Sequence, residues 1–151
     1  MDLDLRHVPR TPLFLGLAGL LPFLWGVATL WVEPLQRLTI DAVGPRFVGP
    51  YVLLSYGTVI LSFMSGVLWG FAAKGRGGTG YALSVVPALW AFFFVGGGPV
   101  SASIYLIAGF LGVLAIDWVF WRSGMTPPWW MALRVALTAI VVACLAVVAL
   151  P

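Results

Sequence analysis

Charge is scarce in this chain, and so are the side chains that bind metals or form disulfides. Only 9% of the 151 residues are Asp, Glu, Lys or Arg, and Cys144 and His7 are the single cysteine and the single histidine. One cysteine excludes a disulfide within the chain. So few charges also exclude an ordinary water-soluble globule, whose surface needs polar cover over much of its area.

What the chain has in abundance is apolar sequence. Hydrophobic residues make up 62% of it, and the mean hydropathy is +1.06. A hydrocarbon core of about 30 Å requires about 20 helical residues. Stretches of about that length predict five transmembrane spans, at residues 12–32, 48–73, 81–95, 100–121 and 129–150.

The apolar stretches predict helices, because backbone groups in lipid must be paired within the segment and no alternation typical of barrel strands is present. The expected fold is all-α, an integral membrane bundle of five transmembrane helices forming one domain over residues 1–151. The first span is too long for a signal peptide and lacks a convincing cleavage site, so we expect a retained helix.

The distribution of Lys and Arg predicts the orientation in the membrane. Two cations, Arg37 and Arg46, lie in the loop after the first span, which also carries Glu33 and Asp41. The other side of the membrane holds Arg6, Arg10, Lys74, Arg76, Arg122 and Arg134. By the positive-inside rule the N-terminus lies in the cytoplasm or matrix and the C-terminus on the opposite side. The basic pI reflects this arrangement, so nucleic acid is not an expected partner, whereas membrane lipids are.

Small residues mark the strongest candidate for a helix-packing surface. Thr58, Ser62, Gly66 and Gly70 recur every fourth residue, which predicts a helix-packing ridge on the second span. We expect an internal packing seam, with a substrate path as the alternative. We also expect the second helix to be central and Leu61 to face lipid.

Two prolines and one polar segment predict local irregularities. Pro22 and Pro87 lie inside the first and third spans, where each removes a backbone hydrogen bond and is expected to kink the helix, with neighbours repairing the loss. Residues 33–47 carry apolar side chains near helical spacing, with charges between them. This pattern predicts a short interfacial helix or turn on the outer surface.

Ionisable residues within spans are functional candidates, and the spans offer Asp117 and Arg134. Each lies about one turn from the inner end of its span, and the loop between the two spans is short. We expect an intramembrane ion pair, with Arg122 as the rival partner of the aspartate. Separate snorkelling towards the headgroups and a proton-coupling Asp117 are the alternatives.

No pattern of a catalytic, metal or cofactor site is visible. The spans carry no histidine for haem and no cluster of metal ligands. Ser62 and Ser65 have no base near them in sequence, and the glycines that follow Lys74 lack the spacing of a phosphate-binding loop. We therefore expect no enzyme activity, no catalytic, cofactor-binding or metal site, and no cofactor.

Four stretches resemble a small uncharacterised multi-pass membrane family typified by mitochondrial transmembrane protein 69. The sequence YGTVILSFMSGVLWG at residues 56–70 looks like the family's hallmark helix. Residues 11–23, 84–89 and 129–138 are similar to its first, third and last spans. Leu68 departs from the pattern, which has a basic residue just before the tryptophan. The resemblance implies a multi-pass protein of the bacterial inner membrane and implies no reaction.

Three functional hypotheses follow. The leading one is a non-catalytic accessory subunit or assembly factor, docked onto a larger membrane complex that is expected to be respiratory. The second is a small transporter or channel with Asp117 as its coupling carboxylate and the face of Thr58 and Ser62 lining a path. The third is a lipid- or quinone-binding membrane protein that uses the aromatic residues at the inner interface.

Overall fold

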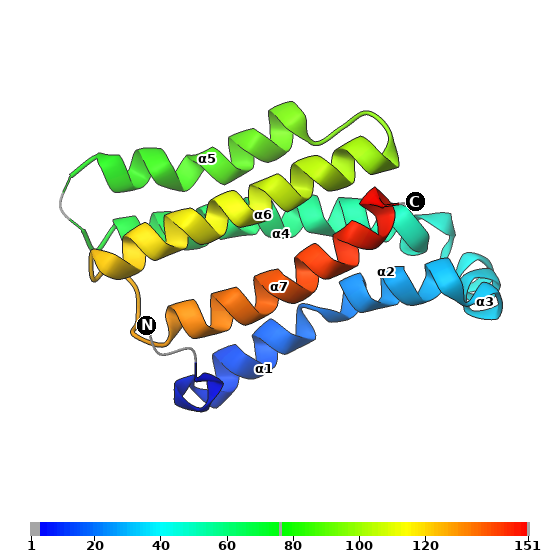
Figure 1. Ribbon diagram of the computed structural model, residues 1–151, viewed down its shortest axis with the longest axis horizontal. Helices are drawn as coiled ribbons and strands as arrows, with labels where there is room; N and C mark the ends of the chain where they lie inside the picture. Colours follow the sequence, from blue (N-terminus) through cyan, green and yellow to red (C-terminus); the bar gives the residue numbers. More distant parts are fainter. Residues whose placement is uncertain (1–3, 76, 151) are drawn as a thin grey trace.

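The computed structural model describes residues 4–75 and 77–150, and every regular element in them is a helix (Figure 1). The α-helices are α1 (Arg10–Ala18), α2 (Leu21–Trp31), α3 (Glu33–Val43), α4 (Gly49–Ala72), α5 (Thr79–Phe94), α6 (Pro99–Arg122) and α7 (Trp130–Ala149). Two 3-10 turns, η1 (Leu5–His7) and η2 (Pro45–Phe47), complete the set. The predicted all-α class therefore holds for the described residues.

Proline and glycine set several helix boundaries. Proline occupies one of the first two positions of α2, α3, α4 and α6, where a missing N–H costs no intrahelical bond. Gly44 follows α3 with φ of 97° and Gly124 follows α6 with φ of 71°. Positive φ at these positions favours glycine and ends each helix where the next segment turns away.

Four helical segments are long and apolar enough to cross a membrane. They are Arg10–Trp31, which joins α1 and α2, and the helices α4, α6 and α7. The predicted third span forms α5, an apolar helix of only 16 residues. The structure therefore supports a multi-pass helical membrane bundle, with four full-length spans and one shorter helix in place of five equivalent spans.

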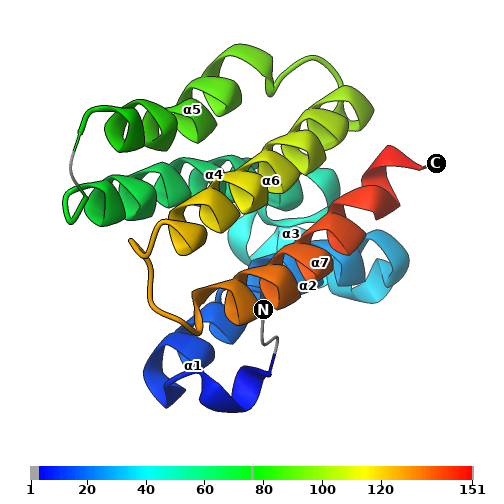
Figure 2. The ribbon, with the colours of Figure 1, turned by 60° about the vertical axis from the view of Figure 1, so that its left-hand side comes forward.

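Helix α4 lies at the centre of the bundle, as the sequence predicted. It contacts α2, α5, α6 and α7, and Figure 1 shows it behind α6, with α5 above it and α2 below it. Figure 2 shows the same helices turned by 60°. Leu53, Leu61 and Leu68 of α4 pack in the main core against Leu106 and Phe110 of α6. The expectation that Leu61 faces lipid is wrong, because its exposed fraction is 0%.

The first span is broken rather than merely kinked. Helix α1 ends at Ala18, two residues intervene, and α2 begins at Leu21. Pro22 lies at the second position of α2 and cannot donate to the carbonyl of Ala18. The sequence predicted a kink at Pro22. The structure has a break just before Pro22, and the lost α-helical hydrogen bond is the one that the Pro22 nitrogen cannot donate.

Pro87 is accommodated inside α5 with help from α4. The backbone N–H of Ala88 donates to the Ser65 hydroxyl of α4 at 2.8 Å. A backbone donor next to the proline is thus satisfied by a side chain of the neighbouring helix, which is how such groups are tolerated in lipid. Ser65 therefore acts as a structural acceptor between the two helices.

The two ends of the bundle differ in charge. The polar segment after the first span forms α3 and η2, and Figure 1 shows α3 turned across the direction of the long helices at the end where α2 finishes. Arg37, paired with Glu33 on α3, belongs to this end. The opposite end carries Lys74, just after α4, and Arg122, at the end of α6. Arg76, which the sequence assigned to that same basic end, lies outside the described residues.

Candidate functional site

Asp117 of α6 and Arg134 of α7 meet within the bundle. The Nε–H of Arg134 donates to Asp117 Oδ2 at 2.7 Å. The exposed fraction of Asp117 is 0% and that of Arg134 is 5%. The structure thus brings together the two residues that the sequence expected to pair. Burial without a partner would be costly for either charge, and pairing makes the site neutral overall.

A third side chain, Trp130, completes this group. Its indole Nε1–H donates to the second carboxylate oxygen of Asp117 at 2.7 Å. Both oxygens of the carboxylate therefore have a donor. The sequence did not lead us to expect this contact of Trp130. The signal was available, because Trp130 lies four residues before Arg134 and hence on the same face of α7.

Arg122, the rival partner, interacts elsewhere. Its guanidinium lies 4.9 Å from the ring centroid of Trp118, one turn back on α6. This is a cation–π contact at the basic end of the bundle. Asp117 and Trp118 are adjacent in sequence, yet their side chains leave the helix in different directions, so only Asp117 turns towards α7.

Beside the ion pair lies a cavity of about 450 Å³ between the first two helices, α4 and α7. It is mostly apolar and its lining includes Phe23, Tyr56, Phe110, Arg134 and Thr138. Arg134 Nη2 and Thr138 Oγ1 are buried without a hydrogen-bond partner, and no other buried side-chain N or O atom in the described ranges, 4–75 and 77–150, shares that state. Buried polar groups are nearly always paired, so these two atoms mark the site.

The predicted ridge on α4 points out of the bundle. Ser62, Gly66 and Gly70 are exposed and Thr58 is half-buried. A Cβ added at Gly66 or Gly70 would meet nothing within 4 Å. The expectation of a packing seam inside the chain is therefore wrong: the inner contacts of α4 are made by another face, which carries Gly57, Leu61 and Leu68. The residues of the ridge remain available to a partner outside the chain.

The hydroxyls of the ridge are already satisfied. Thr58 donates to the carbonyl of Leu54 at 2.8 Å, and Ser62 donates to the carbonyl of Thr58 at 2.9 Å. Each bond lies within α4, so the face presents small side chains and no unpaired donor. This is a surface suited to close approach of another helix, and it offers little to a polar solute.

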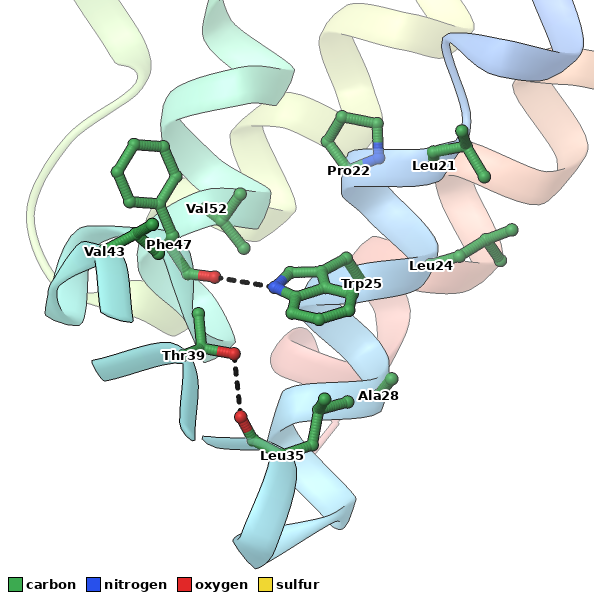
Figure 3. Close-up of a pocket in the computed structure, with 10 residues that line it drawn as sticks. All are labelled: Leu21, Pro22, Leu24, Trp25, Ala28, Leu35, Thr39, Val43, Phe47 and Val52. Carbon is green, nitrogen blue, oxygen red and sulfur yellow. Dashed lines mark hydrogen bonds between the residues drawn. The ribbon is translucent and has the colours of Figure 1, made fainter. Parts of the chain in front are cut away.

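A second concavity, of about 720 Å³, lies at the other end between α2, α3 and the start of α4 (Figure 3). The polar groups in it are paired. Trp25 Nε1–H donates to the carbonyl of Phe47 at 3.1 Å, and Thr39 Oγ1–H donates to the carbonyl of Leu35 at 2.7 Å (Figure 3). Figure 3 shows the remaining side chains, among them Leu24 and Val52, as apolar walls. This groove can hold hydrocarbon but has no free group to recognise a head.

Comparisons with known proteins agree with the resemblance seen in the sequence. The chain is 32% identical over 145 residues to Transmembrane protein 69 of Xenopus tropicalis, a match that covers 91% of this chain and 53% of that protein. The chain thus spans about half the length of this relative. No solved structure matches. Residues 8–150 match the family described as "Protein of unknown function (DUF3429)", and with nearly the whole chain covered, the protein belongs to that family, typified by transmembrane protein 69.

Proposed function

We propose that this protein is a non-catalytic membrane subunit or assembly factor that docks onto a larger complex of the bacterial inner membrane, with a respiratory complex as the expected host. The observation that carries the proposal is the outward-facing ridge of Thr58, Ser62, Gly66 and Gly70. Lipid tails are as apolar as the helix side chains, so burying those side chains against another helix gains no hydrophobic free energy. Helices in lipid therefore associate through close packing at small residues. No neighbouring helix of the described chain lies within 4 Å of a Cβ added at Gly66 or Gly70.

The charge distribution supports the proposed orientation. We infer that the end with Lys74 and Arg122 is cytoplasmic. We infer further that α5 crosses the membrane with the others. Its 16 residues reach about 24 Å, and Figure 1 shows it running alongside α6 for most of its length. The N-terminus is then cytoplasmic and the C-terminus periplasmic.

The contacts favour docking over transport. A coupling carboxylate must exchange protons, whereas both oxygens of Asp117 accept bonds from Arg134 and Trp130. The hydroxyls of Thr58 and Ser62, which a substrate path would use, are bonded to their own helix. Of the alternatives, lipid or quinone binding is the one supported by a specific observation, the mostly apolar cavity beside the ion pair.

The test is native gel electrophoresis of the tagged chain, extracted in mild detergent from its own membrane, with Gly66→Leu as the variant. A Cβ added at Gly66 meets nothing within 4 Å and the position is exposed, so the stability of the isolated chain should stay within about 0.5 kcal/mol of wild type. We expect the high-mass band to be lost. Gly112→Leu is the control, because Gly112 of α6 is also exposed and open; equal high-mass bands for both variants would refute docking through α4.

A further inference from the structure

The groove between α2, α3 and the start of α4 has a shape that suits a single hydrocarbon chain. Its volume is about 720 Å³. Leu21, Leu24 and Ala28 line it from one face of α2, and the seven-residue step from Leu21 to Ala28 covers about 10 Å along the helix axis. The groove therefore runs lengthwise along α2 (Figure 3), which is the direction that acyl chains take in a bilayer.

The walls of this groove select an aliphatic occupant. Trp25 and Thr39, the lining residues with polar side chains, each donate to a backbone carbonyl already. A polar group that entered the groove would lose its water and find no partner there, which is costly. Leu21 and Leu24 keep exposed fractions of 63% and 49%, so the groove opens sideways to the hydrocarbon of the membrane.

Helix α3 favours a lipid chain over another membrane-crossing helix as the occupant. Leu35 and Thr39 of α3 line the groove, and Figure 1 shows α3 turned across the direction of the long helices where α2 finishes. A further helix seated in the groove and continuing across the membrane would run into α3. A flexible acyl chain can bend and leave beside it.

Arg46 supplies a cation where such a chain would leave the groove. Val43 and Phe47 line the groove after the last turn of α3 and are exposed. The guanidinium of Arg46 lies 5.2 Å from the centroid of the Phe47 ring. Arg46 forms no ion pair with any residue in the described ranges, 4–75 and 77–150. The groove thus has an uncompensated positive charge beside its wall.

The other charges at this end do not neutralise Arg46. Arg37 is paired with Glu33 on α3. Asp41 lies two residues from both Thr39 and Val43, which line the groove, and two residues correspond to about 200° around a helix. The Asp41 position is therefore on the face of α3 opposite the groove. A phosphate beside Phe47 would meet one free cation and no facing carboxylate of α3.

We propose that this groove is a binding site for an anionic phospholipid, with one acyl chain lying along α2 and the phosphate bound to Arg46 beside Phe47. The apolar walls accommodate the chain, and the single cation complements the head group. A basic residue near the membrane surface attracts anionic lipids, whereas a zwitterionic head would bring an ammonium group close to Arg46. This site is separate from the ridge on α4 and adds a lipid ligand to the proposed docking protein.

The test is native mass spectrometry of the full chain, released from detergent and titrated with phosphatidylglycerol or phosphatidylcholine of identical acyl chains. Wild type should bind one phosphatidylglycerol about 3- to 5-fold more tightly than it binds phosphatidylcholine. Arg46→Gln should lower the affinity for phosphatidylglycerol to that for phosphatidylcholine. Ala28→Phe fills the groove and keeps Arg46, so it should lose the single tighter site for either lipid.

Two matched controls separate the groove from general effects of charge and size. Arg37→Gln removes a cation from the same end that is already paired, and should bind phosphatidylglycerol like wild type. Ala108→Phe adds the same ring at an exposed position of α6 outside the groove lining, and should also bind like wild type. Thermal unfolding without added lipid establishes that all four variants are folded.

Each contrary result overturns the proposal in a different way. Unchanged affinity for phosphatidylglycerol in Arg46→Gln would remove the head-group contact. An effect of Arg46→Gln without any effect of Ala28→Phe would place the phosphate on the surface with the groove unused. Equal losses in Arg37→Gln and Arg46→Gln would indicate general attraction to basic residues. All of these measurements use the isolated chain, so they fail or succeed independently of docking through Gly66.

Discussion

At the residue scale, the group formed by Asp117, Arg134 and Trp130 decides how two ionisable residues are held inside an apolar bundle. Both hydrogen bonds that link them, one from Trp130 and one from Arg134 to the Asp117 carboxylate, measure 2.7 Å. The neutrality of the pair, the paired carboxylate and the buried, unpaired Nη2 of Arg134 come from the same arrangement.

Breaking the pair should destabilise the protein strongly. Asp117→Asn and Arg134→Gln should each lower the free energy of unfolding by about 3–5 kcal/mol, because each leaves one buried charge without its counterion. The double variant should cost less than the sum of the two single changes, since two neutral amides carry no uncompensated charge. Thermal unfolding in one detergent, followed for all four proteins, gives the double-mutant cycle.

Arg122→Gln is the matched control for that cycle. Arg122 is exposed and contacts Trp118, so its loss should change stability by less than about 1 kcal/mol. Additive effects of the Asp117 and Arg134 changes would contradict a coupled pair.

At the scale of the element, close helix contacts are made at glycines that the i+4 pattern did not select. A Cβ added at Gly109 of α6 would lie 2.6 Å from Leu61 Cδ2 and 2.9 Å from Trp90 Cδ1. The corresponding position at Gly112, one turn along the same helix, is open. The seam between α4, α5 and α6 therefore runs through Gly109, where three helices converge.

Gly109→Ala should destabilise the bundle by about 1–3 kcal/mol, because the side chains of both Leu61 and Trp90 must move to make room. Gly112→Ala should be neutral or stabilising by up to about 1 kcal/mol, since alanine has the higher helix propensity and nothing obstructs its Cβ. Thermal unfolding of the two variants side by side measures the difference. A seam at Gly109 would be contradicted by equal stabilities.

At the scale of the whole molecule, the break between α1 and α2 and the short helix α5 set the overall architecture. Helix α1 contacts α7, while α2 contacts α7 and also packs on α4, so the first span gains α4 as a neighbour after its break. The cavity lies where that change occurs, with Gly16 and Gly19 of this span in its lining. Helix α1 begins and helix α7 ends at opposite ends of the bundle (Figure 1).

That arrangement predicts opposite sides for the two termini. Alkaline phosphatase fused after Leu150 should be active, because the proposed topology exports the C-terminus, and green fluorescent protein at the same point should stay dark. Fusions after Lys74, at the basic end, should give the reverse pattern. A bright C-terminal fluorescent fusion would mean that α5 does not cross.

The sequence by itself determined the solvent, the helical class, the approximate spans and the charge asymmetry, because these follow from the length and composition of local segments. It also indicated the pairing of Asp117 and Arg134, since a short loop forces α6 and α7 side by side. Tertiary structure alone decided which face of α4 turns inward. The ridge of small residues and the face of α4 that carries Gly57, Leu61 and Leu68 both have helical spacing. Only the positions of α2, α5 and α6 decide which of the two is buried. The cavity was equally hidden, because it depends on how the first two helices lie against α4 and α7.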